Sequence, residues 1–317
     1  MTLRPAAWII SLAAAALGAS AAHSQNFPSK RFSLVTSEIG GAGDFASRLI
    51  GQGLTTALGQ PVIIENRAAV AAEYVAKAPP DGYTLLHYGN TVWISPLLRT
   101  TRWDVLKDFS PIMLTVRAPN VLVVTPSLPA KSVKELIALA KARPGQLNYA
   151  SSTTGSSTHL AAELFNVMAG VNIVRVNYKG VSMGINDVMS GRVQLMFLAP
   201  GAVTTHIKSG KLKALAVTGA KPSQLFPGLP TVAASGVAGY ESAANFGLFA
   251  PARTPAPVVT RINQEVARVL GVADVKEKLF NSGMEVVAGS PEEFLATLKS
   301  EIAKWSKVIQ KAGIREE

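Results

Sequence analysis

Two short turns carry the residues of this chain that are best suited to bind an anion. Residues 40–44 read Gly-Gly-Ala-Gly-Asp, and residues 151–158 read Ser-Ser-Thr-Thr-Gly-Ser-Ser-Thr. Each turn joins a strand-like run to a helix-like run, so unpaired backbone N–H groups and the positive end of a helix dipole lie at the turn. Glycine lets a ligand approach the backbone, and serine and threonine hydroxyls can donate or accept hydrogen bonds. Two such turns, one from each half of the molecule, could hold one carboxylate group between them.

Strand-like and helix-like runs alternate along the chain and must position these turns. Short apolar runs predict strands at 32–37, 61–65, 83–88, 120–125, 147–150, 171–178, 193–198, 212–218 and 246–250. Apolar residues at helical spacing predict helices at 44–58, 69–78, 133–142, 159–169, 257–270 and 291–311. This alternation indicates parallel βαβ units with helices covering a sheet, so the predicted fold class is α/β.

Residues 1–24 are predicted to be a cleaved secretion signal. Arg4 supplies the positive charge, residues 6–19 form an almost unbroken apolar stretch, and small residues at 19–24 offer a cleavage site. The apolar stretch is shorter than the ~20 residues that a spanning helix needs, so we favour cleavage over an uncleaved membrane anchor. We therefore expect the mature chain to be soluble and to act outside the cytoplasm.

The composition allows a two-lobed protein and excludes cysteine chemistry. With 317 residues, 48% of them hydrophobic, the chain can bury a large core and exceeds the ~100–150 residues of a typical domain. Cys 0 excludes disulfides, a thiolate metal site and a cysteine nucleophile. The formal net charge of +11 favours anionic partners. The basic residues are scattered singly, without interleaved aromatics, so we expect no nucleic-acid partner.

An ordered set of short motifs resembles one family of receptors over nearly the whole mature chain. The motifs are Glu-Asn-Arg at 65–67, Ala-Pro-Pro-Asp-Gly-Tyr-Thr-Leu at 78–85, Leu-Lys-Asp-Phe at 106–109, Ser-Leu-Pro-Ala-Lys-Ser at 127–132, Asn-Tyr-Ala-Ser-Ser at 148–152, Tyr-Lys-Gly at 178–180 and Trp-Ser-Lys-Val-Ile at 305–309. One such motif is weak, but the ordered set is specific. The chain is similar to the periplasmic solute receptors of tripartite tricarboxylate transporters, the Bug receptors.

The resemblance implies a type II periplasmic binding protein, in which two α/β lobes close on a solute like a Venus flytrap. We expect lobe I to comprise residues 25–124 and 246–317, and lobe II residues 125–245, with hinge strand crossings near Val124 and Phe246. The family holds a small carboxylate in the cleft and passes it to membrane transporter subunits. We therefore expect a monomeric periplasmic receptor without a catalytic residue, a cofactor or a metal.

The resemblance also implies which residues hold the carboxylate. In this family the first strand-to-helix turn and the Ser/Thr turn of the second lobe grip the carboxylate from two sides, largely through backbone amides and ordered water. The expected ligand-binding residues are Ile39, Gly40, Gly41, Ala42, Gly43, Asp44, Asn90, Thr91, Trp93, Ser152, Thr153, Thr154, Ser156, Ser157, Thr158, His159, Lys179, Gly180 and Leu198. The sequence also allows simpler roles, with Asp44 as a helix N-cap, His159 as a packed side chain and Lys179 as a surface cation.

The chain departs from the family pattern in several places. The Gly-rich stretch that usually follows Glu-Asn-Arg is shortened to residues 68–72, so one wall of the usual pocket is expected to be missing. Glu38 stands where proline is common. Trp93 stands where a small residue is common and could form a flat wall for an aromatic or longer-chain carboxylate, unless it belongs to the core. Leu198 and Ala199 replace an Asp-Asn pair that could hold an ammonium group, which argues against an amino acid ligand.

An NAD(P)-dependent oxidoreductase is the main alternative from another class of protein. The motif Gly41-x-Gly43-x-x-Ala46 follows a strand, opens a helix and precedes Glu65 at the end of the next strand, as in a Rossmann fingerprint. The secretion signal takes the chain away from cytoplasmic nicotinamide pools. The ordered motifs also place Glu65 in a different pattern, so we favour the receptor.

Two further alternatives differ in how far the sequence supports them. A hydrolase is not supported, because His87, His159 and His206 lack the spacing of a metal site. The sequence does not separate a transport receptor from an accessory that presents its solute to a membrane signalling kinase, since both need the same closing receptor.

Overall fold

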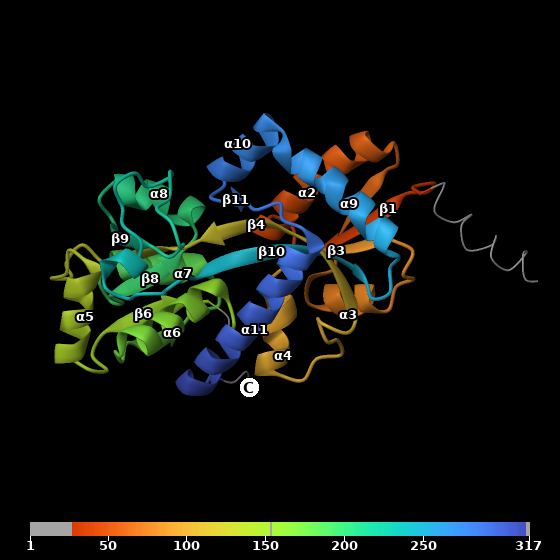
Figure 1. Ribbon diagram of the computed structural model, residues 1–317. Helices are drawn as coiled ribbons and strands as arrows, with labels where there is room; N and C mark the ends of the chain where they lie inside the picture. Colours follow the sequence, from red (N-terminus) through yellow and green to blue (C-terminus); the bar gives the residue numbers. More distant parts are fainter. Residues whose placement is uncertain (1–26, 153, 315–317) are drawn as a thin grey trace, which may run out of the picture.

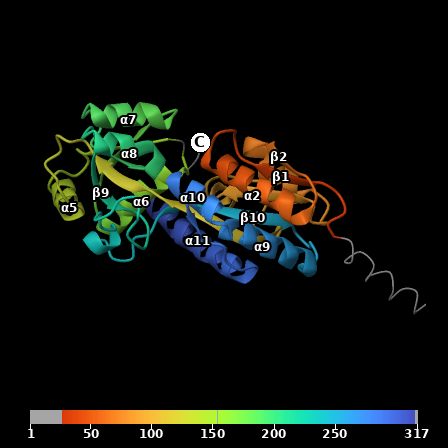
Figure 2. The same cartoon turned by 90° about the horizontal axis from the view of Figure 1, so that it is seen from above.

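The computed structural model describes residues 27–152 and 154–314, which fold into two α/β lobes, each built on one sheet (Figure 1). The predicted secretion signal, residues 1–24, lies outside the described residues, as does Thr153. The two sheets lie toward opposite ends of an elongated molecule, and Figure 2 shows the same separation from above. The α/β class and the two-lobe architecture are confirmed.

The first sheet is six-stranded, in the order β11-β4-β10-β3-β1-β2. Its strands are β1 (Phe32–Thr36), β2 (Val62–Asn66), β3 (Thr84–Gly89), β4 (Phe109–Pro119), β10 (Ala243–Pro251) and β11 (Glu285–Val286). β1 pairs in parallel with β2 and β3, whereas β10 runs antiparallel to β3 and β4. The predicted parallel units therefore describe the first three strands, whereas β10, one of the two strands that connect the lobes, runs in the opposite direction.

The second sheet is five-stranded, in the order β7-β6-β8-β5-β9. Its strands are β5 (Val121–Val124), β6 (Asn148–Ser151), β7 (Val174–Asn177), β8 (Leu195–Leu198) and β9 (Lys213–Val217). β6 pairs in parallel with β7 and β8, and β5 runs antiparallel to β8 and β9. Each lobe thus has a set of parallel strands whose carboxyl ends lie at one edge of the sheet.

Helices cover both sheets. The first lobe has α2 (Ala42–Leu58), η1 (Ala68–Val70), α3 (Ala71–Ala76), α4 (Thr91–Leu98), α9 (Ala256–Gly271), α10 (Ala273–Asn281) and α11 (Pro291–Ala312). The second lobe has α5 (Val133–Ala142), α6 (Ser157–Ala169), α7 (Val181–Met189), α8 (Pro200–Lys208) and η2 (Ala233–Ser235). The periodicity did not predict α4, because its residues are mostly apolar and surround Pro96.

The chain passes between the lobes at Asn120 and again between β9 and β10, and β4 and β10 lie side by side where they connect the lobes (Figure 1). The two passages are linked, because the Asn120 N–H group donates to Thr218 Oγ1 at 2.7 Å and that hydroxyl donates to the Ser242 carbonyl at 2.6 Å. The chain moves from one sheet to the other slightly before the crossings predicted near Val124 and Phe246. From Val121 onward β5 pairs within the second sheet, and from Ala243 onward β10 pairs with β4 of the first sheet. The exact lobe boundaries stay a prediction.

The last helix, α11, packs against both lobes. A capping box begins it, in which Ser290 Oγ accepts the Glu293 N–H group and the Glu293 carboxylate accepts the Ser290 N–H group. Phe294 and Trp305 are each 1% exposed and belong to one apolar cluster with strand residues of both sheets. The helix contacts β4 and α4 of the first lobe and α6 of the second. Its apolar face therefore anchors one side of the molecule across the junction.

Candidate functional site

The predicted binding residues gather where parallel strands of the two sheets end. The turns after β1, β3, β6, β7 and β8 lead directly to the N-termini of α2, α4, α6, α7 and α8. In open α/β sheets, ligands bind outside the carboxyl ends of the strands, where helix N-termini offer free N–H groups. The two lobes are in contact here. The Leu98 side chain of α4 lies so close to the Gly155 backbone that a Cβ atom on Gly155 would be 2.7 Å from Leu98 Cδ1.

The β1–α2 turn is held by a carboxylate of its own. Asp44 Oδ2 accepts the Gly40 N–H group at 3.0 Å, and Asp44 Oδ1 accepts Asn66 Nδ2 at 2.9 Å. Arg48 donates to Asp44 at 3.0 Å. Burial opposes ionisation of Asp44, but the hydrogen bonds from Arg48, Gly40 and Asn66 lower the pKa of its carboxyl group below the usual value of 3.8. Asp44 therefore supplies an internal anion in the first turn of α2, while Gly41 is the N-cap residue.

The glycines of this turn serve different purposes. Gly40 has a φ of +82°, which an L side chain rarely adopts. A Cβ atom on Gly43 would lie 2.9 Å from Ser37 Oγ and 3.2 Å from the Phe246 ring, so Gly43 allows α2 to pack closely on the hinge strand β10. A Cβ atom on Gly41 would meet nothing closer than 3.6 Å. Ile39, at 78% exposed, stands at the tip of the turn.

A buried polar chain links this turn to the hinge strands. Ser47 Oγ lies 2.7 Å from the Gly43 carbonyl oxygen and 2.7 Å from His87 Nδ1. The other ring nitrogen, Nε2, lies 2.8 Å from Thr115 Oγ1, and Thr115 donates to the Phe246 carbonyl at 2.9 Å. Burial lowers the pKa of His87 to about 4, so its ring is neutral at pH 7. His87 is therefore structural and adds no charge to the site.

The β6–α6 turn is built from hydroxyl groups and one neutral histidine. Ser156 caps α6, since its Oγ accepts the His159 N–H group at 3.3 Å. Thr158 Oγ1 lies 3.0 Å from Ser156 Oγ and 3.3 Å from Ser152 Oγ. His159 is 2% exposed and accepts the Gly155 N–H group on Nδ1 at 3.1 Å. Burial, assisted by the charge of Arg175, lowers the pKa of His159 to about 3.

The cation of this turn is Arg175, which the sequence analysis missed. It lies on β7, beside β6, and its guanidinium donates to Ser151 Oγ at 2.7 Å, Thr154 Oγ1 at 3.1 Å and the Ser152 carbonyl at 2.7 Å. These acceptors are uncharged, and the acid that interacts electrostatically with Arg175 is Glu163, whose carboxyl pKa is raised by burial. The sequence signal that could have revealed it is the arginine between two valines in the strand Val-Arg-Val-Asn. Arg175 fixes the turn and makes its surroundings positive.

One pocket of about 320 Å³ lies against both turns. Glu38 of the first turn lines it together with Thr154 and Gly155 of the second. The rest of its lining comes from the segment after β2, from β3, from α4 and from the following loop, namely Ala68, Ala69, Ala72, Tyr88, Thr91, Val92, Ile94, Ser95, Leu98, Arg99 and Trp103. We call this cavity the side pocket. The β1–α2 segment reaches this pocket through Glu38, and none of residues 40–44 lines it.

Several predicted site residues lie elsewhere. The structure does not support Trp93 as an apolar wall, because Trp93 is 1% exposed and packs against Phe249 and Phe294 in the core. The tryptophan that lines the side pocket is Trp103. Leu198 is also 1% exposed and packs in the core of the second lobe. Their side chains therefore do not offer a surface to a solute.

The remaining predicted residues keep positions at the strand ends. Asn90 is the N-cap residue of α4 and Gly180 that of α7, whereas Thr91 and Lys179 are exposed beside them. Among the described residues, Lys179 forms no hydrogen bond or ion pair with either turn, so its role stays a prediction. Thr153 lies outside the described residues, and the other members of the predicted set belong to the two turns themselves.

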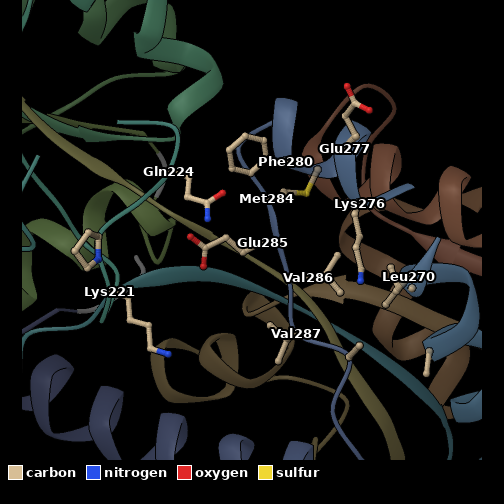
Figure 3. A pocket seen from close by; sticks show the side chains of 14 residues that line it. Lys221, Gln224, Leu270, Lys276, Glu277, Phe280, Met284, Glu285, Val286 and Val287 are labelled. Atoms are coloured by element: carbon tan, nitrogen blue, oxygen red, sulfur yellow. The ribbon is translucent and has the colours of Figure 1, made fainter. Parts of the chain in front are cut away.

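A larger pocket of about 980 Å³ lies elsewhere between the lobes and lacks these features. Figure 3 shows Lys221 and Gln224 on one side of it, and Lys276 and Glu277 on the other. None of the predicted binding residues that the structure describes lines it, whereas Thr91 and Thr154 line the side pocket. The side pocket, although smaller, is the better candidate for an anion.

Comparisons with known proteins identify relatives of this chain. Residues 46–314 match the family model described as the tripartite tricarboxylate transporter family receptor. The chain is 32% identical over 283 residues to protein BugT of Bordetella pertussis (strain Tohama I), covering 87% of each chain. It is similar to the solved structure of R. palustris Rpa4515 with adipate, at 40% identity and a TM-score of 0.77, covering 91% of this chain and 99% of that chain.

A second solved structure, MatC (Rpa3494) from Rhodopseudomonas palustris with bound malate, is 28% identical with a TM-score of 0.74, covering 89% of this chain and 100% of that chain. Within residues 27–152 and 154–314, no helix combines the length and apolar character needed to cross a bilayer. The family match extends over most of the chain and includes the β6–α6 turn, whereas the β1–α2 turn lies just before its first residue. The chain belongs to the tripartite tricarboxylate transporter receptor family, whose members are periplasmic solute-binding receptors.

Proposed function

We propose that this chain is a periplasmic receptor that binds a small carboxylate between its lobes and delivers it to the membrane subunits of a tripartite tricarboxylate-type transporter. The observation that carries the proposal is the shared lining of the side pocket, to which Glu38 of the first turn and Thr154 and Gly155 of the second contribute. The relatives solved with adipate and with malate support the class of ligand.

The second turn supplies most of the attraction for the carboxylate. The N-terminus of α6 and the guanidinium of Arg175 both contribute positive potential there, and the hydroxyls of Ser152 and Thr154 can donate to a carboxylate oxygen. The first turn already contains the carboxylate of Asp44, so it contributes backbone N–H groups rather than net charge. The second turn therefore attracts the carboxylate electrostatically, and the first turn donates backbone N–H groups to it when the lobes close.

Closure of the lobes completes the site in this proposal. Residues 25–124 and 246–317 would move against residues 125–245 about the paired strands β4 and β10. A carboxylate that contacts both turns stabilises the closed arrangement, because the open one offers it only one turn. The membrane subunits would then distinguish loaded from empty receptor by its shape.

The test is calorimetry on the full chain, expressed with its own leader and purified from the periplasm. Adipate, malate and citrate are titrated, and NADH and NADPH serve as probes of the oxidoreductase alternative. We expect at least one carboxylate to bind and neither nucleotide to do so. A nucleotide that binds while every acid fails would overturn the receptor and favour the Rossmann alternative.

A matched pair of variants tests the site itself. Gly41→Asp places a negative side chain at the N-terminus of α2, whereas Gly41→Asn adds a side chain of the same shape without the charge. Both residues are good N-caps, so the two variants should be similarly stable. We expect Gly41→Asp to abolish carboxylate binding and Gly41→Asn to retain most of it. Equal affinities would remove this turn from the site.

A further inference from the structure

We infer that Glu163 of α6 determines how strongly the β6–α6 turn attracts an anion, and that this carboxylate takes up a proton when a solute carboxylate binds. The inference rests on the proposed function, since it takes the β6–α6 turn as the attracting part of the site. Glu163 lies behind the turn and acts on it through its charge. It therefore tunes the affinity for the solute without contacting it.

Glu163 belongs to a cluster of polar groups on the face of the second sheet that α6 covers. Tyr149 of β6 is 1% exposed, and its hydroxyl donates to Glu163 Oε1. Tyr149 is the register partner of Arg175 on the parallel strand β7, so these two side chains leave the sheet on the same face. His159 lies one helical turn before Glu163 and is 2% exposed. The acid is thus placed behind the arginine that holds the turn.

The surroundings of Glu163 disfavour its ionised form. Burial raises the pKa of the Glu163 carboxyl group above its usual value of 4.5, although the Tyr149 hydroxyl, Asn166 and the charge of Arg175 favour the carboxylate. Burial also raises the pKa of Tyr149, so its hydroxyl keeps the proton and remains the donor. Among the residues that the structure describes, no cation forms an ion pair with Glu163. Its protonation therefore responds to a further charge placed nearby.

The groups that act on this carboxylate come from β6, β7 and α6 itself. α6 packs against β6, β8, β10 and α11. β8 and β10 carry no titratable side chain, and α11 shares an apolar cluster with α6. Glu301 and Lys304 of α11 are hydrogen-bonded to each other. Burial lowers the pKa of His159 to about 3, so this histidine stays neutral while Glu163 titrates. The charge that changes behind the turn is therefore that of Glu163.

A solute carboxylate at the turn brings a second negative charge close to Glu163. At a rise of about 1.5 Å per residue, Glu163 lies roughly 9 Å along α6 from its first residue, Ser157. Two unit charges about 10 Å apart, at an effective dielectric constant of about 20, change each other's equilibria about tenfold. The bound solute therefore raises the pKa of Glu163. Because Glu163 is only partly buried, water can deliver the proton.

The sign of the pH dependence follows from this linkage. Glu163 holds its proton more firmly in the loaded receptor than in the empty one, so binding and protonation favour each other. The affinity is lowest when the pH lies above both pKa values of Glu163. It rises about tenfold as the pH falls below the value in the empty receptor.

The test is calorimetry on the full chain between pH 8 and pH 5.5, with whichever of adipate, malate and citrate binds the unaltered chain most tightly. Each titration is run in two buffers of different ionisation heat, so that the difference counts the protons taken up. Glu163→Gln is titrated with the same acid, so protonation of the solute itself cancels in the comparison. We expect the unaltered chain to take up more protons than Glu163→Gln and to gain affinity toward acid. Glu163→Gln should keep the higher affinity throughout.

Asp187→Asn is the matched control. Asp187 also lies in the second lobe and accepts a hydrogen bond from a tyrosine, Tyr178, at 2.8 Å, but it belongs to α7 and pairs with Arg192. We expect Asp187→Asn to keep the proton count and the pH profile of the unaltered chain. The same loss of pH dependence in Asp187→Asn would contradict a special role of Glu163.

Tyr149→Phe tests the cluster without removing the acid. It deletes the donor that favours the ionised form of Glu163, so the rise in affinity should move to higher pH. This variant carries the test if Glu163→Gln unfolds early. A profile that does not move would then count against Glu163 as the group that takes up the proton.

The outcomes separate this inference from the proposed function. An acid that binds with the same proton count and the same pH profile in the unaltered chain and in Glu163→Gln would overturn the inference and leave the receptor standing. Failure of every acid to bind the unaltered chain would overturn the proposed function together with the inference.

Discussion

The two turns at the side pocket look alike in sequence but are built around opposite charges. The β1–α2 turn closes on the carboxylate of Asp44, which accepts hydrogen bonds from Gly40, Arg48 and Asn66. The β6–α6 turn closes on the guanidinium of Arg175. Two helix N-termini are therefore not two equal anion sites. The first already holds an anion of its own, and the second keeps its positive potential for a ligand.

A buried neutral histidine stands behind each turn. His87 joins Ser47 of α2 to Thr115 of the hinge strand, and His159 accepts the N–H group of Gly155. Burial lowers the pKa of His87 to about 4 and that of His159 to about 3. Neither ring carries a charge at neutral pH, so the electrostatic difference between the turns comes from Asp44 and Arg175.

The largest expected effect comes from removing the cation. Arg175→Ala deletes the charge and the hydrogen bonds that hold Ser152 and Thr154. We expect the affinity for the best carboxylate to fall about 100-fold, equivalent to roughly 3 kcal/mol. Calorimetry checks this, with Arg192→Ala as the control, because Arg192 is an exposed arginine of the same lobe that pairs with Asp187. Equal losses in both variants would contradict the special role of Arg175.

The buried histidines predict how stability changes with pH. A histidine whose pKa is lowered in the folded state takes up protons on unfolding, so its contribution is complete above pH 6.5 and is lost as the pH falls toward 4. Replacing His87 by Gln should remove about 2–3 kcal/mol from the fall in unfolding free energy between pH 7.5 and 4.5. Urea unfolding at the two pH values measures it, with His206→Gln as the control. An unchanged pH dependence in His87→Gln would show that His87 is accessible to protons.

Two glycines of the first turn predict different costs for the same substitution. Gly43→Ala forces a Cβ atom to 2.9 Å from Ser37 Oγ and 3.2 Å from Phe246, so it should destabilise the fold by about 1–2 kcal/mol. Gly41→Ala meets only an ordinary contact at 3.6 Å, and we expect a change within about 0.5 kcal/mol. Chemical unfolding of both variants compares them. A reversed order would mean that close packing on β10 does not determine the position of this turn.

Local features of the sequence predicted the turns and the alternation of elements, because both are determined by residues next to one another. The small residues at 40–44 and 151–158 lie between apolar runs, and the structure places a strand before and a helix after each of them. The resemblance to the receptor family added the two-lobe arrangement, which no local pattern contains.

Contacts between distant residues were beyond that reasoning. Arg175 reaches the second turn only because β7 pairs with β6, with Tyr149 opposite Arg175, and that register is set by the assembled sheet. Trp93 and Trp103 lie close in sequence, yet α4 turns Trp93 into the core and leaves Trp103 at the pocket. Asp44 was expected to cap α2 or to contact the ligand, whereas it organises the turn from inside through a partner on β2, Asn66.

The smallest expected effect concerns the charge of Asp44. Asn at this position can still accept the Gly40 N–H group but loses the ion pair with Arg48, so we expect Asp44→Asn to destabilise the fold by about 1 kcal/mol at pH 7. The pKa of Asp44 is lowered on folding, so its stabilising contribution is complete above about pH 4 and is lost as the pH falls through the folded-state value. The difference between the two chains, measured by thermal unfolding, should therefore shrink from pH 6 toward pH 2.5. A difference that stays constant over this range would mean that the side-chain shape of Asp44, rather than its charge, holds the turn, and the contrast between an anionic and a cationic turn would then rest on Arg175 alone.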